Sequence, residues 1–409
     1  MAKKKKTESK VGDCLERVKK HYKRPILKRA RESSNPYMLR RPTFALSLDI
    51  ATGGGFPAGG VSQIAAPPGV GKNALCNQAI SACQHIYGDE ACIGWIWTEV
   101  AYDKEHARIN GVVVPSSDYE MKLENLQRKK NGWKPLTKAQ MDKRKIELGE
   151  FVIADEGSSA EKLQAAVELV RENRCQLVIV DSVAAVVSQA REDTDLDDEP
   201  QQSAEARLIS EFQKKLWHGF GNSYDGELNL TTMLLINQVR AKRNRRSMFD
   251  REWDVGGAYA VRHGKLVDLW LMPGARIWRT KTGKEARKKA EGYTLIGKDM
   301  RWEISKGKAG CHEGPSGEIA YYFRHGFNIY RDLIVTAMAH DIIKVKTSKK
   351  KGEPDSSRFY LFDDKGEEYD RGDGGIDELQ EQALLDRDFF DFIYWSVMRK
   401  AEVKCVHQL

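Results

Sequence analysis

One short glycine-containing segment constrains this chain more than any other feature. The segment Ala66-Pro-Pro-Gly69-Val-Gly71-Lys72-Asn73 follows a predicted buried strand at residues 61–66 and precedes a predicted helix at about 72–85. Small residues let backbone N–H groups converge on phosphate oxygens, the helix N-terminus adds positive potential, and the lysine reaches the terminal phosphates. An ordinary Gly/Pro turn is the alternative, but the strand–loop–helix context favours a phosphate-binding loop. Its predicted nucleotide contacts are Gly69, Val70, Gly71, Lys72, Asn73 and Ala74.

Two positions depart from the usual motif of such loops. Ala66 stands where the first glycine is usual, which is a mild change. Asn73 stands where Ser or Thr normally supplies a hydroxyl ligand to Mg²⁺, and an amide oxygen reaches the metal with a longer geometry. Nucleotide binding tolerates this change more easily than hydrolysis does. The sequence therefore leaves open whether Asn73 contacts the metal.

Two carboxylates follow other apolar segments. Asp181 ends the run Leu177-Val-Ile-Val180, the Walker B arrangement, which places a carboxylate beside the loop to hold Mg²⁺ directly or through water. The candidate metal site is therefore Asp181 together with Asn73, partly through water. Glu99 lies two residues past a predicted strand at 92–97, where a carboxylate can orient or deprotonate an attacking water. A solvent-exposed acid at a strand end is the alternative for Glu99.

In the rest of the chain, apolar runs typical of strands alternate with segments whose apolar residues recur at helical spacing. Several runs are wholly apolar, which predicts an α/β fold whose mostly parallel, twisted sheet is covered by helices on both faces. No run of 18 apolar residues occurs, which excludes a membrane span. The seven cysteines form no CxxC pair, so we expect a reducing cytoplasm, without a disulfide framework or zinc cluster. The expected strands are 61–66, 92–97, 177–180, 232–236, 266–272 and 301–305, and the expected helices are 72–85, 103–110, 163–173 and 204–220.

Charge and composition divide the chain into three parts. Residues 1–32 hold thirteen basic and four acidic residues, a net charge of +9, so the remainder is at −1 although the whole chain is at +8. Basic tails of this kind are often only solubilising or targeting segments, so function has to be sought in the body. We expect a basic helical arm at 1–36, a core at 37–335 with polar insertions near 115–148 and 279–298, and a small accessory or lid domain at 336–409.

A basic segment with aromatic residues follows Gln238. Cations track phosphates and flat or bulky apolar side chains contact bases, a combination that suits single-stranded nucleic acid. A solvated charged loop is the alternative. The segment 188–203 is acidic, so it cannot bind phosphates by charge. The candidate DNA-binding residues of the basic segment are Arg240, Lys242, Arg243, Arg245, Arg246, Met248, Phe249, Gly256 and Gly257.

The order of these motifs resembles the RecA family of strand-exchange ATPases, over roughly residues 44–340. The resemblance implies a RecA-like P-loop ATPase core that uses ATP and Mg²⁺. The extra C-terminal section and the divergent loop make the chain similar to the phage-type, UvsX-like branch. The segments that carry the resemblance are 46–51, the phosphate loop, 178–185, 206–216, Ile236-Asn-Gln-Val-Arg240, Gly256-Gly257, Lys306-Gly-Lys308 and His325-Gly-Phe-Asn328.

The resemblance also implies roles at the nucleotide. Glu99 takes the position of the catalytic glutamate, which favours that role over the solvent-exposed alternative. Asp103 matches an adenine-contacting Asp, His106 falls where an adenine-stacking Tyr is common, and Phe323 lies where another adenine-side aromatic is found. Imidazole offers less stacking area than a phenol ring, so the nucleotide preference stays open.

Other matching positions connect the nucleotide to DNA and to neighbouring subunits. Gln238 matches the glutamine that senses the γ-phosphate, and the basic segment after it matches the second DNA-binding loop. Lys306 and Lys308 match lysines that reach the ATP of a neighbouring subunit, where cations stabilise transition-state charge. With Glu99, Lys72 and Gln238 they complete the expected catalytic set. Three further DNA candidates lie at i, i+3 and i+7 on one helix face, for which a solvated amphipathic face is the alternative: Arg207, Ser210 and Lys214.

The function that the resemblance implies is that of an ATP-dependent DNA recombinase. Such a DNA-dependent ATPase forms a helical filament on single-stranded DNA and promotes homologous pairing and strand exchange with duplex DNA. The basic arm would dock one subunit on the next through residues such as Ile26 and Leu27, and single-strand-binding and mediator proteins would be further partners. We expect the cytoplasm, or the host cytoplasm and nucleoid if the chain is phage-encoded, and no membrane. The alternatives are a nucleotide-binding DNA filament protein or mediator with weak hydrolysis, a hexameric helicase on the same fold, and a RecA-fold ATPase without a DNA role.

Overall fold

The computed structural model describes residues 10–23, 36–99, 102–187, 204–221, 223–224, 227–241, 253–255, 264–348 and 356–404. The chain divides into two compact units, residues 1–36 and 37–409, and each is described by itself. In the first unit, α1 (Lys10–Tyr22) is a helix with Lys19, Lys20 and His21 in its last turn. It lies within the basic helical arm expected at 1–36. Ile26 and Leu27 lie outside the described residues.

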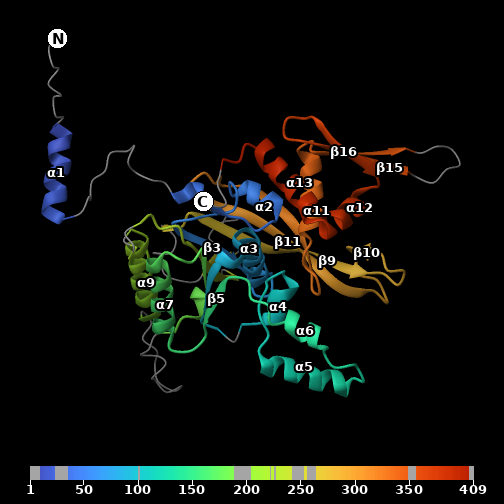
Figure 1. Cartoon of the computed structure of the whole chain (residues 1–409), viewed down its shortest axis with the longest axis horizontal. Coiled ribbons are helices and arrows are strands. Elements are labelled where there is room, and N and C mark those ends of the chain that lie inside the picture. The colour runs from blue at the N-terminus through green and yellow to red at the C-terminus, as the bar shows by residue number, and fades with distance from the viewer. Residues whose placement is uncertain are drawn as a thin grey trace, which may run out of the picture. The chain divides into compact units, whose positions relative to one another are not determined.

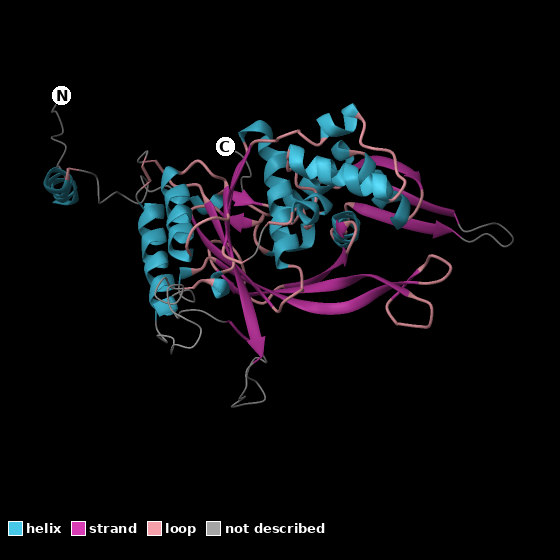
Figure 2. Cartoon of the chain, turned by 90° about the horizontal axis from the view of Figure 1, so that it is seen from below, coloured by secondary structure: helices cyan, strands magenta, loops and turns pink. Residues whose placement is uncertain are grey.

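An 11-stranded sheet forms the centre of the second unit, and Figures 1 and 2 show its long strands beneath and between the helices. The six strands from β9 to β5 run parallel, and β11, β12 and β13 extend the sheet by antiparallel pairing. The predicted α/β fold with a mainly parallel sheet is therefore confirmed, and the antiparallel extension adds to it. The strands in spatial order are β13 (Gly326–Phe327), β12 (Ser316–Tyr322), β11 (Thr294–Gly307), β9 (Val267–Arg279), β3 (Gly60–Ala66), β7 (Thr232–Ala241), β6 (Leu177–Asp181), β4 (Cys92–Trp97) and β5 (Glu150–Ala154), with β10 (Glu285–Ala286) on β9 and β8 (Trp253–Val255) on β7.

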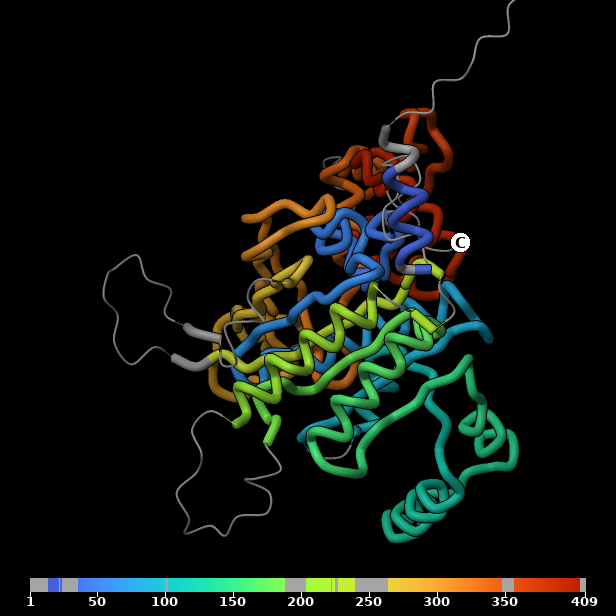
Figure 3. Tube along the Cα trace, turned by 90° about the vertical axis from the view of Figure 1, so that its left-hand side faces the viewer, coloured from blue at the N-terminus to red at the C-terminus, as the bar shows by residue number. Residues whose placement is uncertain are grey.

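Helices cover both faces of the parallel strands, and alternate residues of one strand show it. Leu177 and Ile179 of β6 belong to the core that includes α3 (Lys72–Tyr87). Val178 and Val180 belong to a second core with α7 (Ser159–Glu172) and α9 (Ala204–Gly221). The green α7 and yellow-green α9 run side by side in Figure 3. Because both faces are buried, the strand sequence is continuously apolar and does not alternate.

The expected insertion at 115–148 contains two capped helices. Ser117 and Glu120 form a capping box at the start of α5 (Asp118–Lys130), and Thr137 and Gln140 do the same for α6 (Lys138–Lys143). Such reciprocal hydrogen bonds satisfy the free N–H groups of a helix start. The second expected insertion, at 279–298, forms the tip of the hairpin of β9 and β11. Both strands are longer than the apolar runs at 266–272 and 301–305 had indicated, so the start of β11 falls within it.

The C-terminal section packs on the start of the second unit. Phe390 and Tyr394 contact the ring of Phe44 edge-on, with centroids 5.7 and 5.5 Å away, and the Tyr394 hydroxyl donates to Asp49. These residues join one continuous apolar core with the phosphate-loop helix. The helices of this region are α2 (Leu46–Ala51), α11 (Ile329–Ala339), α12 (Ile376–Leu385) and α13 (Arg387–Lys400), beside a three-stranded sheet of β14 (Ile343–Ser348), β15 (Ser356–Phe362) and β16 (Glu368–Asp373).

Short elements complete the described chain. They are α4 (Lys104–Ile109), β1 (Arg40–Arg41), β2 (Phe56–Pro57) and the 3₁₀ turns η2 (Pro36–Met38), η3 (Gly88–Glu90) and η4 (Val183–Ala185). None of the helices within the described ranges combines the length and the apolar character needed to cross a bilayer.

Candidate functional site

The predicted phosphate loop connects β3 to α3 at the carboxyl edge of the sheet. Gly69 and Gly71 have φ angles of +70° and +125°, which side-chain-bearing residues rarely adopt. A Cβ on Gly69 would have no heavy atom within 4 Å, so backbone conformation, and not crowding, requires glycine there. The loop therefore has the geometry that exposes backbone groups to an anion. Val70 and Ala74 are buried and anchor the loop and the start of α3 in the core.

Lys72 begins α3 and is 8% exposed. Its Nζ lies 3.5 Å from the carbonyl oxygen of Ala66 and 3.4 Å from that of Pro67. Burial lowers the pKa of Lys72, and the charges of Asp181 and Glu99 oppose that shift. The lysine is thus held at the loop, between backbone carbonyls and two carboxylates that favour its charged form.

Asn73 and Asp181 are brought together as the metal prediction required. The amide Nδ2 of Asn73 donates to Oδ2 of Asp181 at 2.7 Å. Burial raises the pKa of Asp181 to about 7, and the charge of Glu99 adds to the shift, while Lys72 and the Asn73 hydrogen bond oppose it. The peptide bond after Asp181 is cis.

These donors fit Mg²⁺ in part. Among the described residues, no three His, Cys, Asp or Glu side chains gather to hold a metal. Mg²⁺ is usually bound by one or two carboxylates together with phosphate oxygens and water, so it does not need such a cluster. The nearly buried Asp181 carboxylate, with the Asn73 side chain against it, matches this donor set, whereas the Asn73 contact uses its amide nitrogen and not its oxygen.

Glu99, which follows β4, accepts hydrogen bonds from residues in or directly after two neighbouring strands. Its Oε1 accepts a hydrogen bond from the Ser182 hydroxyl at 2.6 Å and another from Nε2 of Gln238 at 2.9 Å. Ser182 directly follows Asp181 at the end of β6, and Gln238 lies in β7. Both hydrogen bonds stabilise the ionised carboxylate in one orientation. Ser182 is a site residue that the sequence reasoning missed, because a serine after a strand carries no distinguishing pattern.

The expected base-side residues lie around the start of α4. Asp103 caps this helix by accepting from the backbone N–H of His106 at 3.0 Å. The His106 Nε2 lies 3.0 Å from the Tyr321 hydroxyl, and burial lowers the pKa of the imidazole. Phe323 is 42% exposed, and its ring centroid is 6.4 Å from that of Tyr321. The structure thus brings Asp103, His106 and Phe323 to one area and adds Tyr321, which no sequence pattern had singled out.

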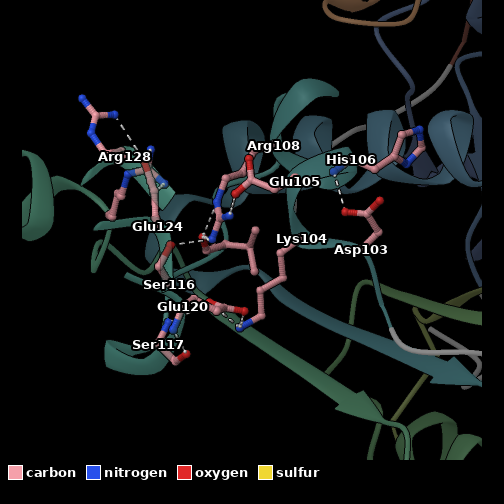
Figure 4. A network of polar contacts seen from close by, with 12 residues as sticks. Asp103, Lys104, Glu105, His106, Arg108, Ser116, Ser117, Glu120, Glu124 and Arg128 are labelled. Carbon is pink, nitrogen blue, oxygen red and sulfur yellow. Dashed lines mark hydrogen bonds and ion pairs between the residues drawn. The ribbon is translucent and has the colours of Figure 1, made fainter. Parts of the chain in front are cut away.

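The opposite face of α4 binds the insertion. Lys104 forms an ion pair with Glu120 at 3.1 Å, and Arg108 donates to the Ser116 hydroxyl at 2.8 Å. Figure 4 shows both cations pointing toward the insertion, away from the side of His106. A cavity of about 590 Å³ opens between α4 and α5. The helix that carries the base-side residues is therefore fastened to the inserted helices.

Lys306 and Lys308 lie far from the phosphate loop of their own chain. In the strand ladder Lys306 lies opposite Asp268 of β9, and Asp268 lies opposite Gln63, three residues before the end of β3. Lys298, at the other end of β11, donates to the Gly69 carbonyl. Lys306 is eight residues along β11 from Lys298, which corresponds to roughly 25 Å at about 3.3 Å per residue. The structure therefore does not bring Lys306 or Lys308 to the cluster around Lys72.

The predicted DNA segment begins and ends on paired strands. Val239 pairs with Val255 and Arg240 with Asp254, so β7 and β8 close the segment between them as a hairpin. Only the backbone of Arg240 is described. The other candidates of this segment lie outside the described residues: Lys242, Arg243, Arg245, Arg246, Met248, Phe249, Gly256 and Gly257. The acidic segment 188–203 lies outside them as well.

Arg207, Ser210 and Lys214 share the outer face of α9, as the spacing predicts. Arg207 and Lys214 are exposed, and Arg207 pairs with Glu211 at 3.1 Å. Ser210 is partly exposed and donates to the Ala206 carbonyl. The face is available to a ligand, although these contacts also suit a solvated helix surface. The residues that bury the opposite face are Ile209, Phe212, Gln213 and Leu216.

Comparisons with known proteins bear on the resemblance. The family model described as the RecA N-terminal domain matches residues 135–263. The RecA protein of Leptospira biflexa is 28% identical over 302 residues, which are 74% of this chain and 63% of that protein. The chain is therefore similar to RecA proteins over most of its length. RecA proteins of Fusobacterium nucleatum (26% identical over 343 residues) and Lactococcus lactis subsp. cremoris (25% over 340) cover 82% of the chain and 74% and 72% of their own lengths.

The similarity to RecA is broad in extent and low in identity. The family model includes Asp181, Gln238 and the basic segment, and the phosphate loop precedes its match. The chain spans 63% of the length of the Leptospira relatives. Activity, substrates and partners therefore have to be argued from the site, because shared fold alone does not carry them.

Proposed function

We propose that this chain is an ATP-dependent DNA recombinase that forms a helical filament on single-stranded DNA and promotes homologous pairing and strand exchange. The observation that carries the proposal is the double hydrogen bond on Glu99. One donor, Ser182, adjoins the candidate metal ligand Asp181. The other donor, Gln238, directly precedes the first paired residue of the hairpin that encloses the basic segment. A nucleotide site and a candidate DNA segment are thereby joined through one carboxylate.

The catalytic steps follow from the positions of the side chains. Lys72 binds the β- and γ-phosphates, and the loop N–H groups bind the oxygens around them. Glu99 orients the attacking water and accepts its proton, while the Ser182 hydroxyl keeps the carboxylate turned toward the phosphate. Asp181 and Asn73 would hold Mg²⁺, which supplies positive charge to the phosphate oxygens when it is bound. Asp103, His106 and Phe323 would receive the base.

Coupling to DNA runs through Gln238. A γ-phosphate that draws the Gln238 amide away from Glu99 would move β7, and with it the start of the basic segment. The candidate residues of the basic segment would bind single-stranded DNA, and the α9 face of Arg207, Ser210 and Lys214 would bind its backbone. Hydrolysis would then weaken DNA binding and allow turnover.

In a filament, a neighbouring subunit would complete each active site. Lys306 and Lys308 would act as catalytic cations on the ATP of a neighbouring subunit, which agrees with their distance from their own loop. The arm at 1–36 would dock subunits, residues 37–335 would form the ATPase core and 336–409 a lid. A phage-type, UvsX-like protein acting in the host cytoplasm, with single-strand-binding and mediator proteins as partners, is the finer form of the proposal.

A second candidate function has one observation in its favour. The Asn73 amide donates to Asp181, in place of the hydroxyl that usually contacts Mg²⁺. A DNA filament protein or mediator that binds nucleotide and hydrolyses it poorly would tolerate this. The two functions share the fold and the filament and differ in turnover.

ATP hydrolysis with and without single-stranded DNA tests the proposal. We expect DNA to stimulate the wild-type chain, and Glu99→Gln to lower the stimulated rate on the order of 10²- to 10⁴-fold, the usual contribution of a general base. A wild-type rate as slow as that of Glu99→Gln would favour the second candidate. Electron micrographs with ATP and DNA test the assembly, since rings in place of filaments would point to a helicase. For the DNA segment, Arg243→Ala with Arg245→Ala should weaken DNA affinity and its salt dependence.

A further inference from the structure

Lys298 is a cation that the proposed catalytic set does not include. It lies in β11, and its ammonium group donates to the carbonyl oxygen of Gly69 at the tip of the phosphate loop. Its neighbour two residues on, Met300, faces the same loop, because the Met300 Sδ lies 3.6 Å from where a Cβ on Gly71 would be. Alternate strand residues share a face, so β11 presents Lys298 and Met300 together to the loop.

The strand is shaped to aim Lys298 at this place. The pairing of β11 with β9 shifts register between Leu295 and Gly297 and again between Lys298 and Met300. Irregularities of this kind redirect side chains and are frequent next to functional sites. Across the other edge of β11, Lys298 pairs with Tyr321, whose hydroxyl contacts His106. Lys298 therefore lies between the phosphate loop and the base-side residues.

Its charge is not neutralised within the described part of the chain. No described carboxylate forms an ion pair with Lys298. The adjacent acid, Asp299, is engaged by Arg287, whose Nε and Nη2 lie 2.9 and 3.1 Å from its two oxygens. Burial lowers the pKa of Lys298, and an anion beside it would favour the charged form. A half-buried lysine that donates to one loop carbonyl has donors left for a second ligand.

We propose that Lys298 is a second phosphate-binding cation of the nucleotide site, supplied by the same chain as Lys72. Its ligand is the polyphosphate of a nucleoside di- or triphosphate lying on the loop. Lys72 approaches the phosphates from the start of α3, and Lys298 approaches from β11 on the base side. The assignment rests on the proposed nucleotide site and deepens it, because it names a contact that does not need a neighbouring subunit.

Calorimetric titration of the full-length chain, without DNA, tests the contact. The probes are ATP, ADP and adenosine, and the variants are Lys298→Met, Lys298→Gln and Lys298→Arg. The matched control is Lys284→Met, which removes an exposed cation from the tip of the same hairpin. We expect each neutral variant to raise the Kd for ATP and ADP on the order of ten-fold, the effect of losing one charge-assisted hydrogen bond. Adenosine binding should not change, Lys298→Arg should stay near wild type, and Lys284→Met should match it.

Two results would overturn the inference. One is unchanged ATP and ADP affinity in both neutral variants. The other is an equal loss of adenosine affinity, which would mean that Lys298 only shapes the loop and the base side. Thermal unfolding of each nucleotide-free variant identifies misfolded protein, and the two neutral substitutions allow for one that fails to fold. Failure of the wild-type chain to bind ATP would overturn the proposed function itself, whereas failure of Lys298→Met alone to weaken binding leaves that function intact.

Discussion

Asp49 gives a quantitative test of how the C-terminal helix is held to the core. The carboxylate is fully buried and accepts hydrogen bonds from the backbone N–H and hydroxyl of Thr43 and from the hydroxyl of Tyr394 on α13. Burial raises the pKa of Asp49 from its ordinary 3.8 to about 7, because desolvation outweighs these three donors. The charge of Asp332 on α11 adds to the shift, and burial raises the pKa of Asp332 itself to about 6.

The sign of the effect on stability follows from this shift. A carboxyl whose pKa is raised by folding favours the folded state while it is protonated. This stabilisation is complete below pH 3.8 and is lost as the pH rises through about 7. A shift of about three pKa units corresponds to roughly 4 kcal/mol at about 1.36 kcal/mol per unit. Between pH 5 and pH 8, Asp49 alone should lower the free energy of unfolding by about 3 kcal/mol.

Asp49→Asn isolates that contribution, because asparagine resembles the neutral acid. Its oxygen can accept from Thr43, and its amide can donate to the Tyr394 hydroxyl. Urea unfolding at pH 5 and pH 8 gives the free energies of both proteins. We expect the variant to gain about 3 kcal/mol relative to wild type between the two pH values, whereas Asp89→Asn, at an exposed position, should gain almost nothing. Parallel pH profiles for wild type and Asp49→Asn would show that Asp49 keeps an ordinary acidity despite its burial.

Further predictions concern Tyr394, Gln238 and Lys306. Tyr394→Phe should lower the free energy of unfolding by about 1.5–3 kcal/mol at pH 8, since it removes a hydrogen bond to a buried charge, and by less at pH 5 in the same urea titrations. Gln238→Ala should reduce DNA-stimulated ATP hydrolysis by roughly 10- to 100-fold, because it removes the side chain proposed to connect the γ-phosphate to the basic segment, while hydrolysis without DNA changes little. Unchanged stimulation of this variant by DNA would refute the proposed coupling through Gln238. Lys306→Ala and Glu99→Gln should each be inactive alone and should recover part of the ATPase rate when mixed, because some interfaces then combine an intact lysine with an intact glutamate. No recovery on mixing would place both residues at a site within one chain.

Local sequence predicted the carboxyl edge of the sheet well. Lys72, Glu99, Asp181 and Gln238 each follow an apolar strand, and parallel strands end at one edge, so their proximity follows from the strand pattern. In the structure Glu99 accepts from Gln238 and Asn73 donates to Asp181, so these residues lie at one edge of the sheet. Their chemical roles still depend on a bound nucleotide and stay predictions.

Contacts that depend on strand register were not predictable. Lys298 reaches Gly69 only because β11 lies beside β9 with a register shift on each side of Lys298, and Tyr321 reaches His106 only through the pairing of β12 with β11. A shift of one residue would turn either side chain to the other face of the sheet, and no local pattern specifies a bulge. Asn73 is similar: its position in the loop suggested a metal contact, which its residue type left open, whereas in the fold its amide nitrogen donates to Asp181.

β11 carries lysines toward two different places. Lys298 lies at the phosphate loop of its own chain, and Lys306 lies at the opposite end of this 14-residue strand. Hydrogen bonds to β9 and β12 on its two sides hold β11 in the sheet, so the strand cannot swing Lys306 toward its own loop. In the proposed filament, one strand would therefore contact two nucleotides through its two ends. Lys298→Met should then weaken nucleotide binding by the isolated chain, and Lys306→Ala should slow turnover only in the filament. Equal loss of nucleotide affinity in both isolated variants would mean that Lys306 serves its own site, against the register of β11.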